Sequence, residues 1–407
     1  MRILFVAMVN SVHTARWIDQ LAGQGWDIHV FSVVELAPCP ELRNVTVHNL
    51  IRHPNAGGVR QTGLIYNPFK RGSNRLVRGA ELLTRGRTEH TARLASLMRS
   101  LRPDMVHTLE MQSAGYLMLQ AASRLERKQI PPWIYSSWGS DIYYYGRQPA
   151  HVARVKGVLK SCDYYIPDCS RDTTLARQYG FGGEILGTFP AGGGFPIDDM
   201  QKLRAPGPPS ARRRITLKGY DHWVYRGVVA VEAVRQCADL LKDYEILVYS
   251  PGNSVRAAAR AAAAETGVRF TLLNQIPHEE MLGMMGNARA SIALSTSDGT
   301  PNAMLESMIM GALPIQSDTG STGEWISDGV NGELVPAEDP DAVAAAIRRV
   351  LTDDAYVDQA AIKNSALTRI RVDASIMRPK VLELYRHVYN RSKGLHSQTA
   401  SHEASAS

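Results

Sequence analysis

Two absences set the first limits on this chain: no apolar run is long enough to cross a membrane, and only four of its 407 residues are cysteine. A membrane-spanning helix needs about 20 consecutive apolar residues. The apolar start, residues 3–8, is too short for a signal peptide, so we expect a buried strand there and a cytoplasmic protein. The cysteines lack the spacing of zinc ligands, and we expect reduced thiols at Cys39, Cys162, Cys169 and Cys237.

Several catalytic signatures are also missing. No Gly-x-Gly-x-x-Gly follows the first predicted strand, and there is no Walker A lysine loop, no His-Glu-x-x-His and no nucleophile-elbow serine. These patterns position a phosphate, a metal or a nucleophile. Their absence argues against a dinucleotide-dependent dehydrogenase, a P-loop kinase, a zinc protease and an α/β-hydrolase.

The composition is that of a globular protein, with 44% hydrophobic and 21% charged residues. A chain of this length exceeds one ordinary core, so we expect two domains.

The net charge of +7 is unevenly distributed: from Arg52 to Arg102 there are eleven Lys and Arg residues against two acids. Such a run is most often a solvated helix face. The alternative is a surface for an acidic acceptor or for anionic lipid, with peripheral contact at the inner membrane face. Nucleic acid is disfavoured because aromatic residues are sparse in the segment.

Apolar β-rich runs alternate with helical patterns along the chain, which predicts parallel sheets flanked by helices. Strands are predicted at Ile3–Met8, Asp27–Ser32, Val45–Leu50, Met105–His107, Trp133–Ser136, Tyr164–Pro167, Arg214–Leu217, Glu245–Tyr249, Arg269–Leu273, Ala290–Ser295, Leu313–Gln316 and Gly332–Val335. Helices are predicted at 14–24, 87–101, 228–241, 340–351 and 381–389.

The segment 195–212 is rich in glycine and proline, which marks a linker between domains. The predicted organisation is a Rossmann-like domain at 1–195, a second at 212–375, a helix at 376–391 that could pack back on the first domain, and a disordered tail at 392–407. Ligands bind at the carboxyl ends of parallel strands, so we expect the two domains to face each other across a cleft that holds the site.

The most informative stretch, residues 290–311, reads as strand, glycine loop and helix. Thr300 is the expected N-cap, and Pro301 the first helical residue. The start of a helix offers N–H groups and a positive dipole end, and both favour a phosphate. The expected contacts to the donor are Gly299, Thr300, Pro301, Asn302, Ala303 and Met304, the last three through their N–H groups.

Two carboxylates frame this anion site: Asp298 before the helix and Glu306 inside it. A diphosphate repels a carboxylate unless the acid faces hydroxyl groups, and a nucleotide sugar carries hydroxyls on both its ribose and its sugar. A surface salt bridge is the alternative role for Glu306, but its apolar neighbours favour a half-buried acid with a specific partner. Two cations that could hold a diphosphate also occur: Lys218 follows a predicted strand, and Arg226 opens the next helix.

These residues resemble the family-4 glycosyltransferases, which have the GT-B fold and retain anomeric configuration. The family carries an acid, seven residues and then a glutamate, and Asp298 and Glu306 have this spacing, with Pro301, Met308 and Gly311 in register. The likeness spans nearly the whole chain and continues through Pro314–Asp318, Gly323-Glu324 and Asn331-Gly332.

The resemblance implies a role for each residue. Glu306 would bind the ribose hydroxyls and Asp298 the donor-sugar hydroxyls, while Lys218 and Arg226 would neutralise the diphosphate and support its departure. This chain differs from the family in having Asp298 where glutamate is usual, and in the wider spacing of its two cations. No metal or cofactor is expected, because the cations and the helix start balance the diphosphate charge.

In the first domain, the resemblance places two loops beside the acceptor and the donor phosphate. The loop after the first strand carries Asn10, Ser11 and His13, and either Ser11 or Thr14 is also a candidate helix N-cap. The second loop carries Asp141, with Trp138 where the family often has histidine. His107, at a strand end, is expected to be structural.

The sequence therefore predicts a metal-independent retaining glycosyltransferase that works through an oxocarbenium-like transition state. A UDP-sugar is the expected donor and GDP-mannose the second choice; the acceptor is a small molecule, a saccharide or a lipid-linked saccharide. Two alternatives remain: an epimerase or phosphorylase on the same fold, and a non-catalytic nucleotide-sugar-binding protein. Because Asp298, Glu306 and Lys218 are all present, the sequence argues against a non-catalytic protein.

Overall fold

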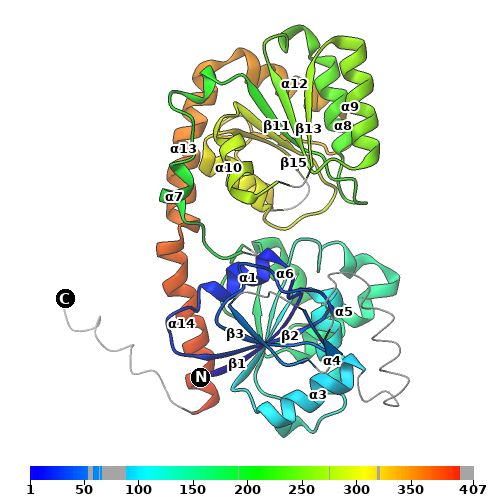
Figure 1. The fold of residues 1–407 in the computed structure, drawn as a ribbon, viewed down its shortest axis with the longest axis vertical. Coiled ribbons are helices and arrows are strands. Elements are labelled where there is room, and N and C mark those ends of the chain that lie inside the picture. Colours follow the sequence, from blue (N-terminus) through cyan, green and yellow to red (C-terminus); the bar gives the residue numbers. More distant parts are fainter. Residues whose placement is uncertain are drawn as a thin grey trace, which may run out of the picture. The chain divides into compact units, whose positions relative to one another are not determined.

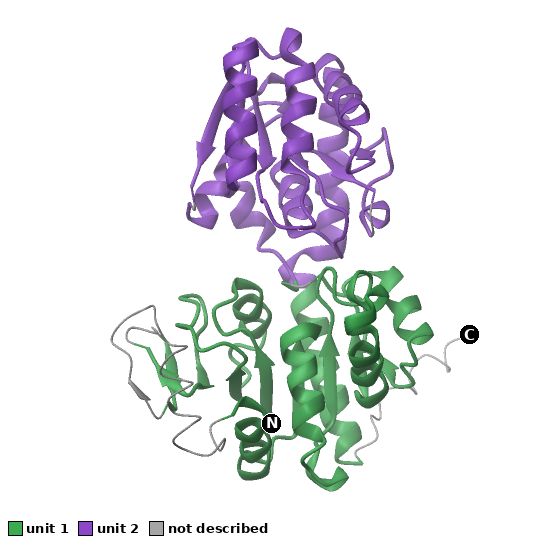
Figure 2. Ribbon diagram, turned by 90° about the vertical axis from the view of Figure 1, so that its right-hand side faces the viewer, with its two compact units in different colours: residues 1–193, 377–407 green, residues 194–376 purple. Residues whose placement is uncertain are grey.

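The computed structural model describes residues 1–53, 58–63, 65–66, 89–190, 192–274, 276–318 and 321–394. The chain divides into two compact units: residues 1–193 with 377–407 form unit 1, and residues 194–376 form unit 2 (Figure 2). Most cations of the basic segment 52–102, and the predicted tail from residue 395 onward, lie outside the described residues.

Unit 1 is built on a parallel sheet of eight strands in the order β10-β9-β8-β7-β1-β2-β3-β5. Its strands are β1 (Arg2–Ala7), β2 (Asp27–Ser32), β3 (Val45–His48), β5 (Val59–Gln61), β7 (Met105–Leu109), β8 (Trp133–Ser136), β9 (Tyr164–Ile166) and β10 (Glu184–Ile185). A separate two-stranded sheet pairs β4 (Ile51–Arg52) with β6 (Ile65–Tyr66). The central strand β1 pairs Ile3 with Ile28 of β2 and with Met105 of β7. Because helices cover both faces of such a sheet, β1 reads as a continuous apolar run.

Helices flank the unit 1 sheet on both faces (Figure 1). One face packs against α1 (Val12–Asp19) and α14 (Ala374–Ser392). The other face packs against α3 (His90–Leu101), α4 (Tyr116–Ala122), α5 (Pro149–Ser161) and α6 (Ser170–Gln178). The helix near the end of the chain therefore completes the core of the domain that contains the start of the chain.

Unit 2 is built on a parallel sheet of six strands in the order β13-β12-β11-β14-β15-β16. Its strands are β11 (Arg214–Lys218), β12 (Glu245–Tyr249), β13 (Arg269–Leu273), β14 (Ala290–Ala293), β15 (Leu313–Ser317) and β16 (Glu333–Val335). The strand order reverses between β11 and β14, which makes their carboxyl ends the expected ligand site of the sheet.

The helices of unit 2 also form two layers (Figure 1). One core contains residues of α8 (Gly227–Gln236), α9 (Asn253–Thr266) and α12 (Pro340–Thr352). The other contains residues of α7 (Ile197–Gln201), α10 (His278–Gly286) and α11 (Asn302–Met310). The long α13 (Asp354–Val372) contributes to both cores. The glycine- and proline-rich segment 195–212 lies within unit 2, where Ile197 and Met200 of α7 join the second core.

The predicted fold class, two parallel-sheet α/β domains, is confirmed. Four strands match their predicted bounds, including those at Asp27–Ser32 and Glu245–Tyr249. The first helix was misplaced: it was expected at 14–24 but begins at Val12, because the Ser11 side chain accepts a hydrogen bond from the His13 N–H and caps it. Helix α13 was not predicted. Its Ile362 and Ile370 are exposed, so its apolar residues do not follow the 3.6-residue spacing of an amphipathic helix.

Candidate active site

The loops after β11 and β14 are joined at the carboxyl edge of the unit 2 sheet. The Arg226 N–H donates to the Leu294 carbonyl at 3.0 Å, and the Thr296 N–H donates to the Val224 carbonyl at 2.8 Å. An isolated antiparallel bridge between Tyr225 and Ser295 lies between these two bonds. The two loops that carry the predicted cations and the predicted acid Asp298 therefore form one structure at the strand-order reversal.

Helix α11 begins one residue later than predicted. Pro301 is the N-cap and Asn302 the first helical residue, so Thr300 is not the cap. The expectation that the Met304 N–H faces a ligand is wrong, because it donates to the Pro301 carbonyl at 3.1 Å. This bond spans three residues, as is common in the first turn of a helix. The preceding loop is fixed by the Ser321 hydroxyl, which donates to the Gly299 carbonyl.

Glu306 is more deeply buried than predicted, with 4% of its surface exposed. Its Oε1 atom lies 2.7 Å from Nε2 of His278, the first residue of α10. A carboxylate this buried requires a specific partner, and His278 supplies one while keeping 38% of its side-chain surface exposed. His278 is not predicted from the sequence, because a histidine at the start of an ordinary amphipathic helix carries no local signal for a partner 28 residues away.

Lys218, the last residue of β11, extends over two aromatic rings. Its Nζ lies 4.3 Å from the ring centroid of Tyr225 and 4.8 Å from that of Tyr220. The two rings meet edge to face, with centroids 5.1 Å apart. Cation–π attraction holds the ammonium group at the carboxyl edge of the sheet. Burial raises the pKa of Tyr225, and the carboxylate of Asp298 raises it further.

Arg226 is engaged by its own loop and by Glu338, which follows β16. Its Nε donates to Oε1 of Glu338 at 2.8 Å, and Nη1 donates to the carbonyls of Trp223 and Tyr225 at 2.9 and 3.1 Å. The guanidinium thus braces the loop that carries the ring of Tyr225. Of the two predicted cations, Lys218 makes contacts that leave it better suited to bind a diphosphate.

Two glycines allow the loops of this edge to approach one another. A Cβ atom on Gly219 would lie 2.8 Å from the backbone of Pro251, and one on Gly227 would lie 2.8 Å from the Val255 side chain. Both distances are below normal carbon–carbon contact. A larger residue at Gly219 would push apart the turns that follow β11 and β12, and one at Gly227 would push α8 away from α9.

The predicted acceptor-side residues all lie at the carboxyl edge of the unit 1 sheet. Asn10 is exposed, Ser11 caps α1, and the His13 ring meets the Trp138 ring edge to face at 5.6 Å. Asp141 is buried: its Oδ2 accepts hydrogen bonds from the Trp138 N–H at 2.9 Å and from the Tyr135 hydroxyl at 3.2 Å. Burial raises the pKa of Asp141 well above its ordinary range. Its carboxyl group therefore shapes the loop that carries Trp138.

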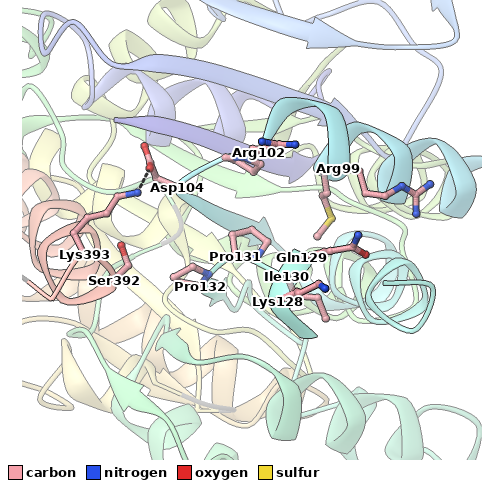
Figure 3. Close-up of a pocket in the computed structure, with 12 residues that line it drawn as sticks. Arg99, Arg102, Asp104, Lys128, Gln129, Ile130, Pro131, Pro132, Ser392 and Lys393 are labelled. Atoms are coloured by element: carbon pink, nitrogen blue, oxygen red, sulfur yellow. Dashed lines mark ion pairs between the residues drawn. The ribbon is translucent and has the colours of Figure 1, made fainter. Parts of the chain in front are cut away.

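The described cavities of unit 1 lie at the opposite, amino-terminal edge of its sheet. One of about 740 Å³ is lined by residues that precede β7 and β8 and by the end of α3 (Figure 3). Its cations include Arg99 and Arg102 at the C-terminal end of α3, and Lys393, which pairs with Asp104 at 2.9 Å. Cations are favoured at helix C-termini, so this basic lining is explained without a ligand.

Within the described part of the chain, no group of three or more His, Cys, Asp or Glu residues is arranged to hold a metal ion. None of the described helices is both long and apolar enough to span a membrane. All four cysteines are buried free thiols.

Family models match both halves of the chain. One described as "Glycosyl transferase 4-like" matches residues 2–65 and 83–167, and one described as "Glycosyl transferases group 1" matches residues 221–353. A phosphatidyl-myo-inositol mannosyltransferase of Mycobacterium tuberculosis is 25% identical over 191 residues, or 46% of this chain and 50% of that protein. The counterpart in Mycolicibacterium smegmatis is 26% identical over 183 residues, 44% of this chain and 46% of that protein. The chain thus matches about half the length of these curated relatives.

Solved structures share the fold over almost the whole chain. Sucrose-phosphate synthase from Thermosynechococcus elongatus has a TM-score of 0.72 at 16% identity, covering 96% of this chain and 100% of that one. The Anabaena protein HepE, in a complex with UDP and glucose, has a TM-score of 0.67 at 14% identity, covering 95% of this chain and 100% of that one.

Proposed function

The chain belongs to the family-4 glycosyltransferases of GT-B fold, and from this premise we propose that unit 2 binds a nucleotide-sugar donor at the carboxyl edge of its sheet. The observation that carries the proposal is the joining of the β11 and β14 loops, which gathers Lys218, Asp298 and the start of α11 at the strand-order reversal. An ammonium group and a helix start are both suited to a diphosphate.

In this proposal each residue has one role. Lys218 contacts the diphosphate, and Glu306, held by His278, accepts hydrogen bonds from the ribose hydroxyls. Asp298 accepts hydrogen bonds from hydroxyls of the transferred sugar. Arg226 braces the loop that follows β11. The N–H groups of Asn302 and Ala303, at the start of α11, are the proposed backbone donors to a phosphate.

The proposed reaction retains anomeric configuration and uses no metal. As the bond between the sugar and the diphosphate breaks, Lys218 and the positive end of α11 stabilise the charge that develops on the leaving group. The acceptor hydroxyl attacks from the face that the diphosphate leaves, and its proton passes to an oxygen of the departing diphosphate. Proton NMR of the product would show the configuration, and an assay in excess EDTA would test the metal requirement.

A UDP-sugar is the first choice of donor, because HepE was solved with UDP and with UDP-glucose. A mannose donor is the second choice, since the curated relatives are named as mannosyltransferases.

For the acceptor, we propose a hydroxyl compound bound at the unit 1 loops that carry Asn10 and His13. A lipid acceptor is the specific candidate suggested by the names of those relatives, and peripheral contact of the basic segment 52–102 with the inner membrane face would suit it.

The test is thermal stabilisation of the purified protein by UDP-, GDP-, ADP- and TDP-sugars, with the variant Glu306→Gln beside the wild type. A ligand that binds only the folded state stabilises it by about 2.7 kcal/mol at a hundredfold excess over Kd. Glu333→Gln is the matched control, since this acid is equally buried but starts β16 at the other edge of the sheet. One nucleotide class should stabilise the wild type and the control but not Glu306→Gln. If no nucleotide sugar stabilises the wild type, the proposal fails.

A further inference from the structure

Tyr249 lies between the two halves of the proposed donor site. It is the last residue of β12 and pairs in register with Lys218, the last residue of β11. Its ring packs in the same core as Met304 and Leu305 of α11. The side chain thus connects the strand end that carries the cation with the helix that carries Glu306.

The hydroxyl of Tyr249 is buried and has no hydrogen-bond partner among the described residues. Only 4% of the residue is exposed, and the hydroxyl oxygen is shielded from solvent without a protein donor or acceptor in reach. Buried polar groups in folded proteins are nearly always paired. The other buried tyrosine among the described residues of unit 2 differs in this respect: the Tyr244 hydroxyl accepts a hydrogen bond from Nη1 of Arg213 at 3.4 Å. The hydroxyl of the half-buried Tyr356 is also paired, lying 2.9 Å from both Oε1 of Glu333 and the Gly332 carbonyl oxygen.

The groups that act on this hydroxyl electrostatically include Glu306 of the proposed donor site. Burial raises the pKa of Tyr249 well above its ordinary value, and the nearby Glu306, Tyr220 and Tyr225 raise it further. The group therefore stays protonated and acts as a hydrogen-bond donor at neutral pH. A phosphate oxygen is an acceptor only, so a buried hydroxyl donor on the residue that pairs with Lys218 in the sheet complements a diphosphate.

The backbone holds Tyr249 in place. The next residue, Ser250, has a φ of 50°, in the left-handed region that residues other than glycine rarely adopt. The Gly252 N–H then donates to the Gly219 carbonyl at 2.8 Å and locks the turn after β12 onto the turn after β11. A strained, fixed backbone at a ligand edge is typical of residues that position a ligand.

We propose that Tyr249 is a donor-binding residue whose hydroxyl donates a hydrogen bond to a phosphate oxygen of the nucleoside diphosphate. The inference rests on the proposed function of the same site. It assigns the missing partner of the buried hydroxyl to the ligand.

The test compares Tyr249→Phe with the wild type by calorimetric titration of UDP, GDP and uridine or guanosine. Tyr244→Phe is the matched control: this tyrosine is also buried but precedes β12 at the opposite edge, where its hydroxyl accepts from Arg213 at 3.4 Å. A hydrogen bond to a charged group corresponds to about a tenfold to hundredfold change in affinity. We expect Tyr249→Phe to weaken binding of the diphosphate by that factor and to leave the binding of the phosphate-free nucleoside and the melting temperature of the free protein unchanged.

Three results would overturn the inference. Equal diphosphate affinity of Tyr249→Phe and wild type would show that the hydroxyl makes no contact with the ligand. An equal loss for nucleoside and diphosphate would place the contact away from the phosphates. A melting temperature lowered as much as in Tyr356→Phe, whose hydroxyl is paired, would make Tyr249 structural. Failure of the wild type to bind any nucleoside diphosphate would instead overturn the proposed function on which the inference rests.

Discussion

The Nε2 atom of His278 lies 2.7 Å from Oε1 of Glu306, so the start of α10 holds the buried acid of α11. This contact restrains the orientation of the buried carboxylate. We expect His278→Ala to raise the Kd of the nucleotide-sugar donor about tenfold, because the unheld carboxylate must be ordered upon binding. Calorimetric titration measures the effect.

The adjacent Glu279 is exposed and provides the control for His278. Glu279→Ala removes a side chain from the same helical turn without touching Glu306, and its donor affinity should equal that of the wild type. Unchanged affinity in His278→Ala would mean that the histidine does not position Glu306.

Removal of the Lys218 ammonium should slow turnover more than it weakens donor binding. Lys218→Met keeps the length of the side chain and its contact with the rings of Tyr220 and Tyr225, but removes the charge that stabilises the leaving diphosphate. Loss of one such electrostatic contact typically lowers kcat by a factor of about 10²–10³. Steady-state kinetics of sugar transfer would show this, with exposed Lys242→Met as the control. A rise in KM with kcat unchanged would show that Lys218 binds ground and transition states equally.

Gly227→Ala should destabilise unit 2, because the added Cβ lies 2.8 Å from Val255 and forces α8 away from α9. Overpacking of this kind costs about 1–3 kcal/mol. Gly283→Ala, inside α10, meets no atom within 4 Å, and we expect it to be neutral or to stabilise by up to about 1 kcal/mol. Urea unfolding of the two variants measures both values. Equal stabilities of the two variants would contradict the prediction.

The neutral, buried His107 makes unit 1 sensitive to acid. Its Nδ1 lies 2.6 Å from the Tyr385 hydroxyl and its Nε2 2.7 Å from that of Ser136. Burial lowers the pKa of His107 from 6.5 to about 3. Between these values the unfolded chain binds the proton and the folded chain does not. The stability that His107 contributes is complete above pH 6.5 and is lost as the pH falls, by about 1.4 kcal/mol per pH unit.

The buried Asp141, whose pKa is raised, acts with the opposite sign in the same unit, so the measurement must be a difference between variants. The free energy of unfolding of His107→Gln should fall less steeply than that of the wild type from pH 6.5 to 4.5. His222→Gln, which removes an exposed histidine of unit 2, is the control and should follow the wild type. Parallel profiles for His107→Gln and the wild type would show that His107 does not remain neutral in the fold.

The sequence by itself determined most strands of the two sheets and the acid motif of unit 2. Strands such as Glu245–Tyr249 were predicted end to end, because a strand buried on both faces must be a continuous apolar run. The spacing of Asp298 and Glu306 was visible because both lie on one loop and helix, where local geometry relates sequence distance to spatial distance. The start of that helix was missed by one residue, since the boundary depends on hydrogen bonds of the loop as well as on Pro301.

The tertiary structure alone decided which residues complete the motif. His278 reaches Glu306, Arg226 braces its loop through Glu338, and Tyr249 stands beside Lys218 through contacts between segments distant in the chain. Helix α14 completes the unit 1 core in the same way, through the Tyr385 hydroxyl, which accepts a hydrogen bond from Trp17 at 2.7 Å. No local pattern encodes such pairs, because each partner has an ordinary sequence context and their proximity arises only when the sheets and helices pack.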